Sequence, residues 1–253
     1  MFRVMNMKEK IYTIPVNEAF DETDGCPLCA MIKKLEDARV KYMLGPAMME
    51  PDIRIESNNN GFCKRHYEMM FAQENKLSLA LILQTHIQEV NKKINSLSES
   101  VESTTPQKRG LFKKGATELR GKAARLANSV EMLTDSCIIC DHIHANLERY
   151  TETLFYMWKN DAAFREKFAN TNHFCLPHYS FLAKRACRNL DDDDALSFFK
   201  VLNEIQKKHL EFLKSDVDRF ILKFDYRNAD MPWENAKDAP KRALETLSGA
   251  EIE

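Results

Sequence analysis

Glycine and proline are scarce in this chain, which has 7 Gly and 8 Pro among 253 residues. Turn-rich β-sandwiches and β-barrels, and nucleotide-binding folds with glycine-rich loops, use these residues more often. No apolar run approaches the roughly 18 residues of a membrane-spanning helix. The first twenty residues lack both the apolar stretch and the small-residue cleavage site of a secretory signal. We therefore expect an all-α, cytoplasmic protein without a transmembrane segment.

An excess of charge of one sign is also missing. The 37 basic and 38 acidic side chains nearly balance, so net charge favours neither a dedicated nucleic-acid-binding protein nor a disordered chain. Hydrophobic residues make up 44% of the sequence, which is enough to build a buried core at this length. Composition and net charge therefore fit a folded protein and identify no partner.

Cysteine and histidine, by contrast, occur in a regular pattern. A CxxC pair, Cys26 and Cys29, is followed by a CxxH pair, Cys63 and His66. The same two pairs recur at Cys137, Cys140, Cys175 and His178. The second CxxC pair lies 111 residues after the first, and the second CxxH pair lies 112 residues after the first. This near-constant offset, with Phe before and Tyr after each CxxH pair, predicts an internal duplication.

Apolar residues recur with helical period after each of these pairs, which predicts that a helix begins at each one. Long helices are expected over 79–97 in the first half and 198–224 in the second half. The acidic cluster Asp191–Asp194 directly precedes the second long helix. We interpret it as a helix cap, with a cation site as the alternative.

Three thiols and one imidazole in each half match the Cys3His ligand set of a closed tetrahedral zinc site. A two-residue spacer lets both side chains of a pair reach one ion, and the helix N-termini would stabilise the negative charge of three thiolates. The simplest prediction is one Zn2+ per half, and pairing across the halves is the alternative. The predicted ligand sets are Cys26, Cys29, Cys63 and His66 in the first half, and Cys137, Cys140, Cys175 and His178 in the second half.

Other metal or thiol chemistry is less compatible with the sequence. An iron–sulfur cluster could use the same ligands, but the common ferredoxin spacings are missing. Redox-active CxxC pairs usually belong to a βαβ setting, and haem attachment needs His directly after CxxC, where Ala30 and Asp141 stand. The nearby His142, His144 and His173 are interpreted as outer or surface groups. Cys187 is expected to be a buried free thiol.

The repeat and the composition divide the chain into four parts. We expect an N-terminal zinc-binding helical module over 1–97, a polar, basic linker over 98–130, a C-terminal zinc-binding helical module over 131–226 and a docking tail over 227–253. Residues 106–128 contain seven Lys or Arg but only one acidic residue. We interpret this segment as a solvated connector, with weak binding of an acidic partner or a nucleic acid as the alternative.

Several segments resemble an uncharacterised bacterial family, classed as a domain of unknown function, with duplicated CxxC and CxxH motifs. The similar segments are IPVNEAF at 14–20, CPLC at 26–29, MMEPDIRIESNNNGFCKRH at 48–66, CIIC at 137–140, FCLPHY at 174–179 and DYRNADMPW at 225–233. This resemblance implies a bacterial cytoplasmic protein and supplies no activity or catalytic residue. The metal prediction therefore depends on ligand spacing alone.

Taken together, these features favour a zinc-binding interaction or regulatory module with an unknown protein partner, in which zinc is structural. No catalytic residue is predicted, because the identified sites have no open coordination position. The alternative is a zinc-dependent enzyme or a thiol-based redox sensor that releases its metal when the thiolates are oxidised.

Overall fold

The computed structural model describes residues 7–22, 24–104, 114–228 and 230–251, and every regular element within these ranges is a helix. The prediction of an all-α protein is therefore confirmed. None of the described helices is long and apolar enough to cross a membrane. The chain forms two compact units: unit 1 contains residues 1–34 and 145–253, and unit 2 contains residues 35–144. Each unit thus combines segments from both sequence halves.

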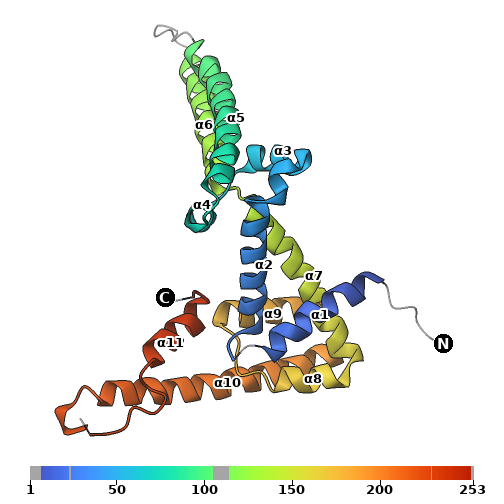
Figure 1. Ribbon diagram of the computed structural model, residues 1–253, viewed down its shortest axis with the longest axis vertical. Helices are drawn as coiled ribbons and strands as arrows, with labels where there is room; N and C mark the ends of the chain where they lie inside the picture. The colour runs from blue at the N-terminus through green and yellow to red at the C-terminus, as the bar shows by residue number, and fades with distance from the viewer. Residues whose placement is uncertain (1–6, 23, 105–113, 229, 252–253) are drawn as a thin grey trace. The chain divides into compact units, whose positions relative to one another are not determined.

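Unit 1 is built mainly from the C-terminal half of the chain (Figure 1). Its elements are α1 (Met7–Asp21), the start of α2 (Pro27–Met43), most of α7 (Ile138–Asn160), α8 (Ala162–Ala169), α9 (Leu176–Asn189), α10 (Asp192–Leu222), the short 3-10 helix η2 (Tyr226–Asn228) and α11 (Ala239–Ser248). In this unit α10 packs against α9 and α11, and α1 packs against α8.

An aromatic cluster forms the centre of unit 1. The ring of Phe168 lies 5.0 Å from that of Phe198 and 5.4 Å from that of Trp158, measured between ring centroids. All three side chains are almost fully buried, and Cys26 and Cys175 belong to the same buried cluster. Replacing one such aromatic side chain by alanine typically costs about 3–5 kcal/mol. The two cysteines are therefore positioned by a rigid core.

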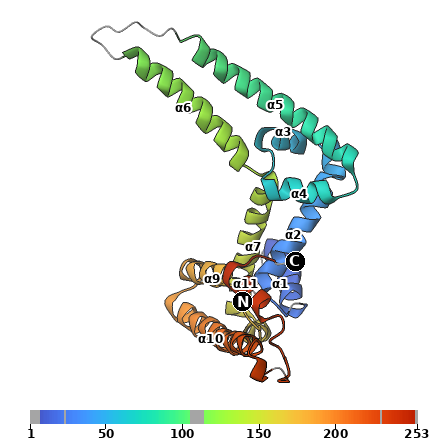
Figure 2. The ribbon, with the colours of Figure 1, turned by 90° about the vertical axis from the view of Figure 1, so that its left-hand side faces the viewer.

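Unit 2 consists of shorter helices and one long helical hairpin (Figures 1 and 2). Its elements are the rest of α2, the 3-10 helix η1 (Pro46–Met49), α3 (Pro51–Asn60), α4 (Lys64–Ala72), α5 (Lys76–Glu102), α6 (Lys114–Asp135) and the start of α7. Helices α5 and α6 pack against each other along the hairpin, and α3 packs against α5. The Asn75 side chain caps α5 by accepting a hydrogen bond from the Ser78 N–H.

The acidic cluster before the second long helix is a helix cap, as predicted. Asp191 is the N-cap residue of α10 and accepts a hydrogen bond from the backbone N–H of Asp194 at 3.1 Å. Lys159 approaches both carboxylates, at 2.8 Å from Asp191 and 3.1 Å from Asp194. The negative charges thus lie at the positive end of α10, where they stabilise the helix.

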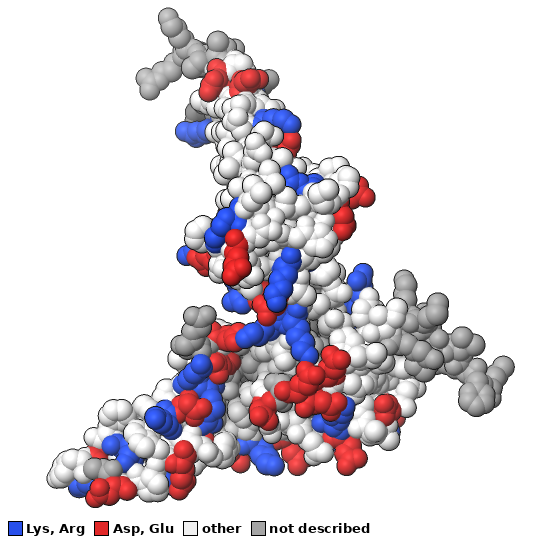
Figure 3. Space-filling view, in the orientation of Figure 1, with Lys and Arg blue, Asp and Glu red and all other residues white. Residues whose placement is uncertain are grey.

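Most of the described part of the segment 98–130, predicted as a basic linker, is helical. Residues 98–102 belong to α5 and residues 114–130 belong to α6, whereas 106–113 lie outside the described residues. Within α6, Arg120 and Arg125 are exposed, and Lys122 forms an ion pair with Glu118 at 3.1 Å. The face of the hairpin visible in Figure 3 is mostly uncharged and carries isolated side chains of both signs.

Candidate metal centres

All four cysteine-containing pairs lie at helix starts, as predicted from the sequence. Helix α2 begins directly after Cys26, and α7 begins directly after Cys137. Cys63 and Cys175 are the N-cap residues of α4 and α9, with extended backbone and no capping hydrogen bond from their side chains. The first backbone N–H groups of a helix have no partner within the helix, and they favour negative charge nearby. Each position therefore suits a thiolate.

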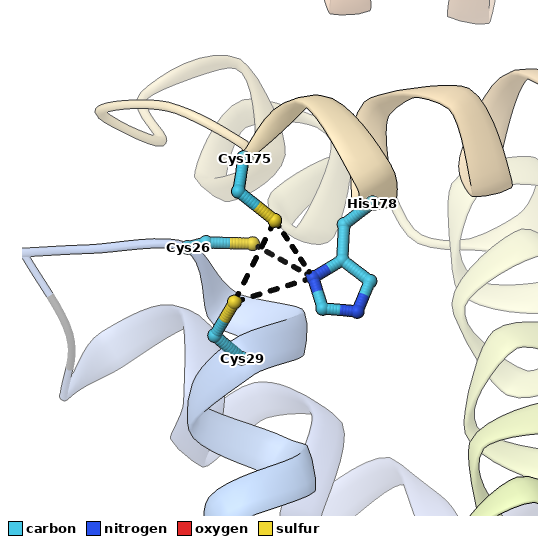
Figure 4. A group of neighbouring side chains, drawn as sticks. All are labelled: Cys26, Cys29, Cys175 and His178. Carbon is cyan, nitrogen blue, oxygen red and sulfur yellow. Dashed lines mark hydrogen bonds between the residues drawn. The ribbon is translucent and has the colours of Figure 1, made fainter. Parts of the chain in front are cut away.

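Centre A lies in unit 1 and combines Cys26, Cys29, Cys175 and His178 (Figure 4). Their ligand atoms all lie within 4.8 Å of one another, and in Figure 4 they point toward a common centre. The Nδ1 atom of His178 is 3.5 Å from Cys26 Sγ, 3.3 Å from Cys29 Sγ and 3.1 Å from Cys175 Sγ. The Sγ atoms of Cys29 and Cys175 are 3.6 Å apart.

Centre B lies in unit 2 and combines Cys63, His66, Cys137 and Cys140. His66 Nδ1 is 3.1 Å from both Cys63 Sγ and Cys137 Sγ, and 3.4 Å from Cys140 Sγ. The Sγ atoms of Cys63 and Cys140 are 3.8 Å apart. In both centres the histidine therefore directs Nδ1 at the three sulfurs.

The sulfur–sulfur distances are close to the edges of a tetrahedron around one zinc ion, and the sulfur–nitrogen distances are slightly shorter than those edges. With Zn–S near 2.3 Å and Zn–N near 2.0–2.1 Å, tetrahedral geometry requires about 3.8 Å between two sulfurs and about 3.6 Å between sulfur and nitrogen. The observed sulfur–sulfur distances are 3.6 and 3.8 Å, and the sulfur–nitrogen distances are 3.1–3.5 Å. All seven cysteines are free thiols. Each cluster therefore has the size and the soft donor set for a single zinc ion.

The predicted pairing of these ligands within each half is wrong. Each centre joins the CxxC pair of one half to the CxxH pair of the other half. The physical reason is the helix that follows each CxxC pair. Helix α2 has 17 residues and α7 has 23 residues, so they carry the chain about 25 Å and 35 Å along their axes. The CxxH pair of the same half follows this helix in the chain and lies beside the CxxC pair of the other half.

The metal-free thiols in these clusters influence one another's ionisation. In centre A, hydrogen bonds to Cys175 and Cys26, together with burial, raise the pKa of Cys29 far above its ordinary value. Hydrogen bonds from Cys26 and Cys29 lower the pKa of Cys175. In centre B, burial and the neighbouring Cys137 raise the pKa of Cys140. Three close thiols cannot all ionise without a cation, and a bound metal ion supplies that positive charge.

The pKa values of the two histidines are shifted in opposite directions. Burial disfavours the charged form of His178, but hydrogen bonds to Cys175 and Cys26 outweigh this effect and raise the His178 pKa to about 9. At His66 burial dominates over the nearby Glu36 and lowers the pKa below its ordinary value. A metal ion bound at centre A would therefore compete with a proton for the His178 imidazole near neutral pH, whereas the lowered pKa of His66 favours its neutral form.

A carboxylate supports the histidine of centre B. Glu36 on α2 is 6% exposed, and its Oε1 lies 3.0 Å from Nε2 of His66. Arg65 donates two hydrogen bonds to the same carboxylate, at 2.9 and 2.7 Å, which lowers the pKa of Glu36. This arrangement fixes the ring so that Nδ1 faces the sulfurs. Glu36 is not predicted from the sequence, because nothing in its local sequence distinguishes it from a surface glutamate.

One family model matches nearly the whole chain. The model of DUF6062, described as a family of unknown function, matches residues 7–253. The chain belongs to the DUF6062 family. The expected resemblance to a family of unknown function is thus confirmed. No curated protein and no solved structure matches the chain.

The remaining histidines of this DUF6062 chain lie outside both clusters. Neither His142 nor His144 belongs to a described group of three or more metal-binding side chains. The ring of His173 stacks on that of His209 at a centroid distance of 4.0 Å. Burial and the neighbouring His173 lower the pKa of His209 to about 4, so this ring is neutral at pH 7. The prediction that Cys187 is buried is wrong, because its position on α9 faces solvent.

A pocket of about 710 Å³ lies in the same unit of this DUF6062 chain as centre A. Its lining includes Asp24, two residues before Cys26, and His173, two residues before Cys175. The His209 ring and the Arg242 side chain also contribute to the wall. Arg242 is already neutralised by Asp216, at 2.8 Å, and is held in place by it.

Proposed function

We propose that the chain is a zinc-binding helical protein with one Zn2+ at each centre, and that both ions are structural. The observation that carries this proposal is the convergence of three sulfurs and one imidazole nitrogen at tetrahedral distances in both units. Thiolate and imidazole together favour zinc over hard cations such as Mg2+ or Ca2+. The ligands proposed are Cys26, Cys29, Cys175 and His178 at centre A, and Cys63, His66, Cys137 and Cys140 at centre B.

Four protein ligands complete the coordination of a structural zinc ion, whereas catalytic zinc keeps a position for water or substrate. Both centres offer four ligands. Centre A also includes Cys26 and Cys175 of the buried core, and centre B includes the buried His66 and Cys137. Four ligands per centre, two of them buried, support a structural role in which zinc holds chain segments together, and they disfavour a zinc-dependent enzyme.

Centre B is positioned to stabilise the base of the hairpin. Its CxxH pair lies at the start of α4, the helix that precedes α5, and its CxxC pair follows the end of α6. A zinc ion there would join the two ends of the segment 63–140. We propose that this clamp presents the hairpin α5–α6 as an interaction surface for a protein partner. The hairpin carries the exposed apolar side chains Leu77, Ile87 and Met132, which a bound partner would cover.

Metal analysis of the purified protein tests this proposal. We expect two zinc ions per chain in the wild type, and one in each of the variants Cys63→Ser and Cys175→Ser. The base of the hairpin, near residues 61–63 and 135–137, should be accessible to protease in Cys63→Ser, and in the wild type after zinc is removed. Cys187→Ser is the matched control and should keep both ions. Iron, visible absorbance or a metal-free wild type would contradict the proposal.

A second candidate function is thiol-based redox sensing in the reducing cytoplasm. It is favoured by the short distances between sulfurs from different segments, 3.6 Å for Cys29 and Cys175 and 3.8 Å for Cys63 and Cys140. Peroxide would oxidise one thiolate to sulfenic acid. The second thiolate would then attack that sulfur and form a disulfide, expelling hydroxide, which takes a proton from solvent to give water, and zinc would be released. Titration with hydrogen peroxide while free zinc is recorded separates the candidates. Retention of zinc at millimolar peroxide would exclude sensing.

The basic residues of α6 support a weaker proposal of nucleic-acid binding. Arg120 and Arg125 are exposed on the described part of the segment 106–128. Binding of a labelled RNA oligomer should weaken between 50 and 200 mM salt, in proportion to the number of phosphates contacted. Charge reversal at both arginines should abolish this binding. RNA binding that survives charge reversal, or that is independent of salt, would contradict a role for this face.

A further inference from the structure

The C-terminal segment of the chain passes close to centre A. We define the C-terminal strap as residues 239–251, which comprise α11 and the three residues after it. Gly249 ends α11 with a left-handed backbone, at φ 71° and ψ 5°. A Cβ added at Gly249 would lie 3.2 Å from Cys175 Sγ and 3.3 Å from Cγ of Pro177. The backbone of the strap therefore packs directly on one of the four ligand atoms.

The end of the strap also reaches the other half of centre A. Glu251 forms an ion pair with Lys33 of α2, and α2 is the helix that carries Cys29. Cys175 belongs to the start of α9, which packs against α11. The strap thus contacts both segments that supply ligands to centre A, and it lies in the same unit as the centre.

The strap buries little apolar surface. Among the described side chains of α11, only Ala239 and Thr246 are buried, while Leu244 and Leu247 are 54% and 55% exposed. Thr246 Oγ1 lies 3.1 Å from Nε2 of His209 on α10. The Arg242 side chain donates to Asp216 of α10 at 2.8 Å. A segment with so little buried apolar surface opens at a lower free energy than the aromatic core of the unit.

We propose that the C-terminal strap closes over centre A and controls how fast metal leaves it, while centre B exchanges metal independently of the strap. This inference depends on the proposed metal binding and adds a gate to one of the two centres. With the strap closed, a chelator or an oxidant must wait for it to open before it can reach Cys175. The strap is thus a regulatory element, and a partner that displaces it would make centre A labile.

Zinc release from the full-length protein tests this gate. The zinc-loaded protein is mixed with excess chromophoric chelator, and Cys175→Ser and Cys63→Ser assign the kinetic phases to centres A and B. Thr246→Val removes the hydroxyl that lies 3.1 Å from Nε2 of His209, and Thr246 is not one of the four ligands of centre A. We expect it to accelerate the phase of centre A about fivefold, as the loss of one hydrogen bond predicts, without changing that of centre B. Gly249→Ala should accelerate the same phase, because its Cβ would push against Cys175 and Pro177.

Ser248→Ala is the matched control, because among the described residues the Ser248 hydroxyl bonds only to the Leu244 carbonyl and the Ala250 N–H, both within the strap. It should leave both phases unchanged, and circular dichroism should show wild-type helix content in each variant. Unchanged release in Thr246→Val and Gly249→Ala, or equal acceleration of both phases, would overturn the gate. If the wild type binds two zinc ions and the variants give either of these results, only the gate by the strap is refuted. A wild type without zinc would refute the proposed function.

Discussion

Gly61→Ala should destabilise unit 2 strongly, because this position combines an unusual backbone with a close neighbour. Gly61 ends α3 at φ 64° and ψ −152°, a region that side-chain-bearing residues adopt at a cost of about 1–3 kcal/mol. An added Cβ would lie 2.7 Å from Nε2 of His86. His86 is only 8% exposed, and its Nδ1 is 2.9 Å from the carbonyl oxygen of Asn58. Displacing the ring would break this buried hydrogen bond, at about 1–3 kcal/mol.

The combined expectation is a loss of about 2–6 kcal/mol, a large share of the stability of a typical domain. The change should also affect centre B. The Gly61 carbonyl accepts a hydrogen bond at 3.2 Å from the N–H of Ile138, which links the CxxH segment to the start of α7. Moving Gly61 would thus disturb both halves of the ligand set, and zinc affinity at centre B should fall while that at centre A is retained.

Urea unfolding at fixed free zinc measures this effect. Both tryptophans, Trp158 and Trp233, belong to unit 1, so their fluorescence reports that unit, whereas circular dichroism reports the helices of both. Gly61→Ala should shift the circular dichroism transition and leave the fluorescence transition in place. Gly121→Ala is the control, because its Cβ would meet no atom within 4 Å and should stabilise α6 by about 0.5–1 kcal/mol. A loss below about 1 kcal/mol in Gly61→Ala would refute the reasoning.

Three further predictions concern the outer parts of the sites and the helix caps. Glu36→Gln should weaken zinc binding at centre B about 10–100-fold in a chelator competition, with centre A unaffected. The pKa of His209 is lowered to about 4 in the folded chain, so between pH 6.5 and pH 4 this side chain binds a proton in the unfolded chain but not in the folded one. The free energy of unfolding should therefore fall as the pH drops from 6.5 toward 4. In His209→Gln, this decrease in melting temperature should be smaller; an identical decrease would contradict the assignment. Asp191→Ala should cost about 0.5–2 kcal/mol in urea unfolding through loss of the α10 cap, and a neutral result would count against capping.

The helices and the ligand residues could be predicted from the sequence because both depend on local patterns. Apolar periodicity and the scarcity of glycine and proline indicate helices, and the Cys and His spacing identifies the eight clustered side chains. The position of Asp191 before a long apolar pattern likewise predicts the cap that the structure contains.

The ligand pairing depends instead on the tertiary path of the chain. The helical pattern after Cys29 fits a chain that returns to its own CxxC pair as well as one that meets the other pair, because the direction of the returning chain is set by packing. The supporting carboxylate of Glu36 is 30 residues away from His66 in the sequence and belongs to no motif. The approach of Gly249 to Cys175 joins residues 74 positions apart, which a local pattern does not encode.

Zinc content of two double variants tests the central claim most directly, because crossed and local pairing predict opposite results. With crossed pairing, Cys26→Ser/Cys175→Ser removes two ligands of centre A alone and should retain one zinc ion at centre B. Cys26→Ser/Cys63→Ser removes one ligand from each centre and should retain none. One zinc ion in Cys26→Ser/Cys63→Ser, together with none in Cys26→Ser/Cys175→Ser, would contradict the account.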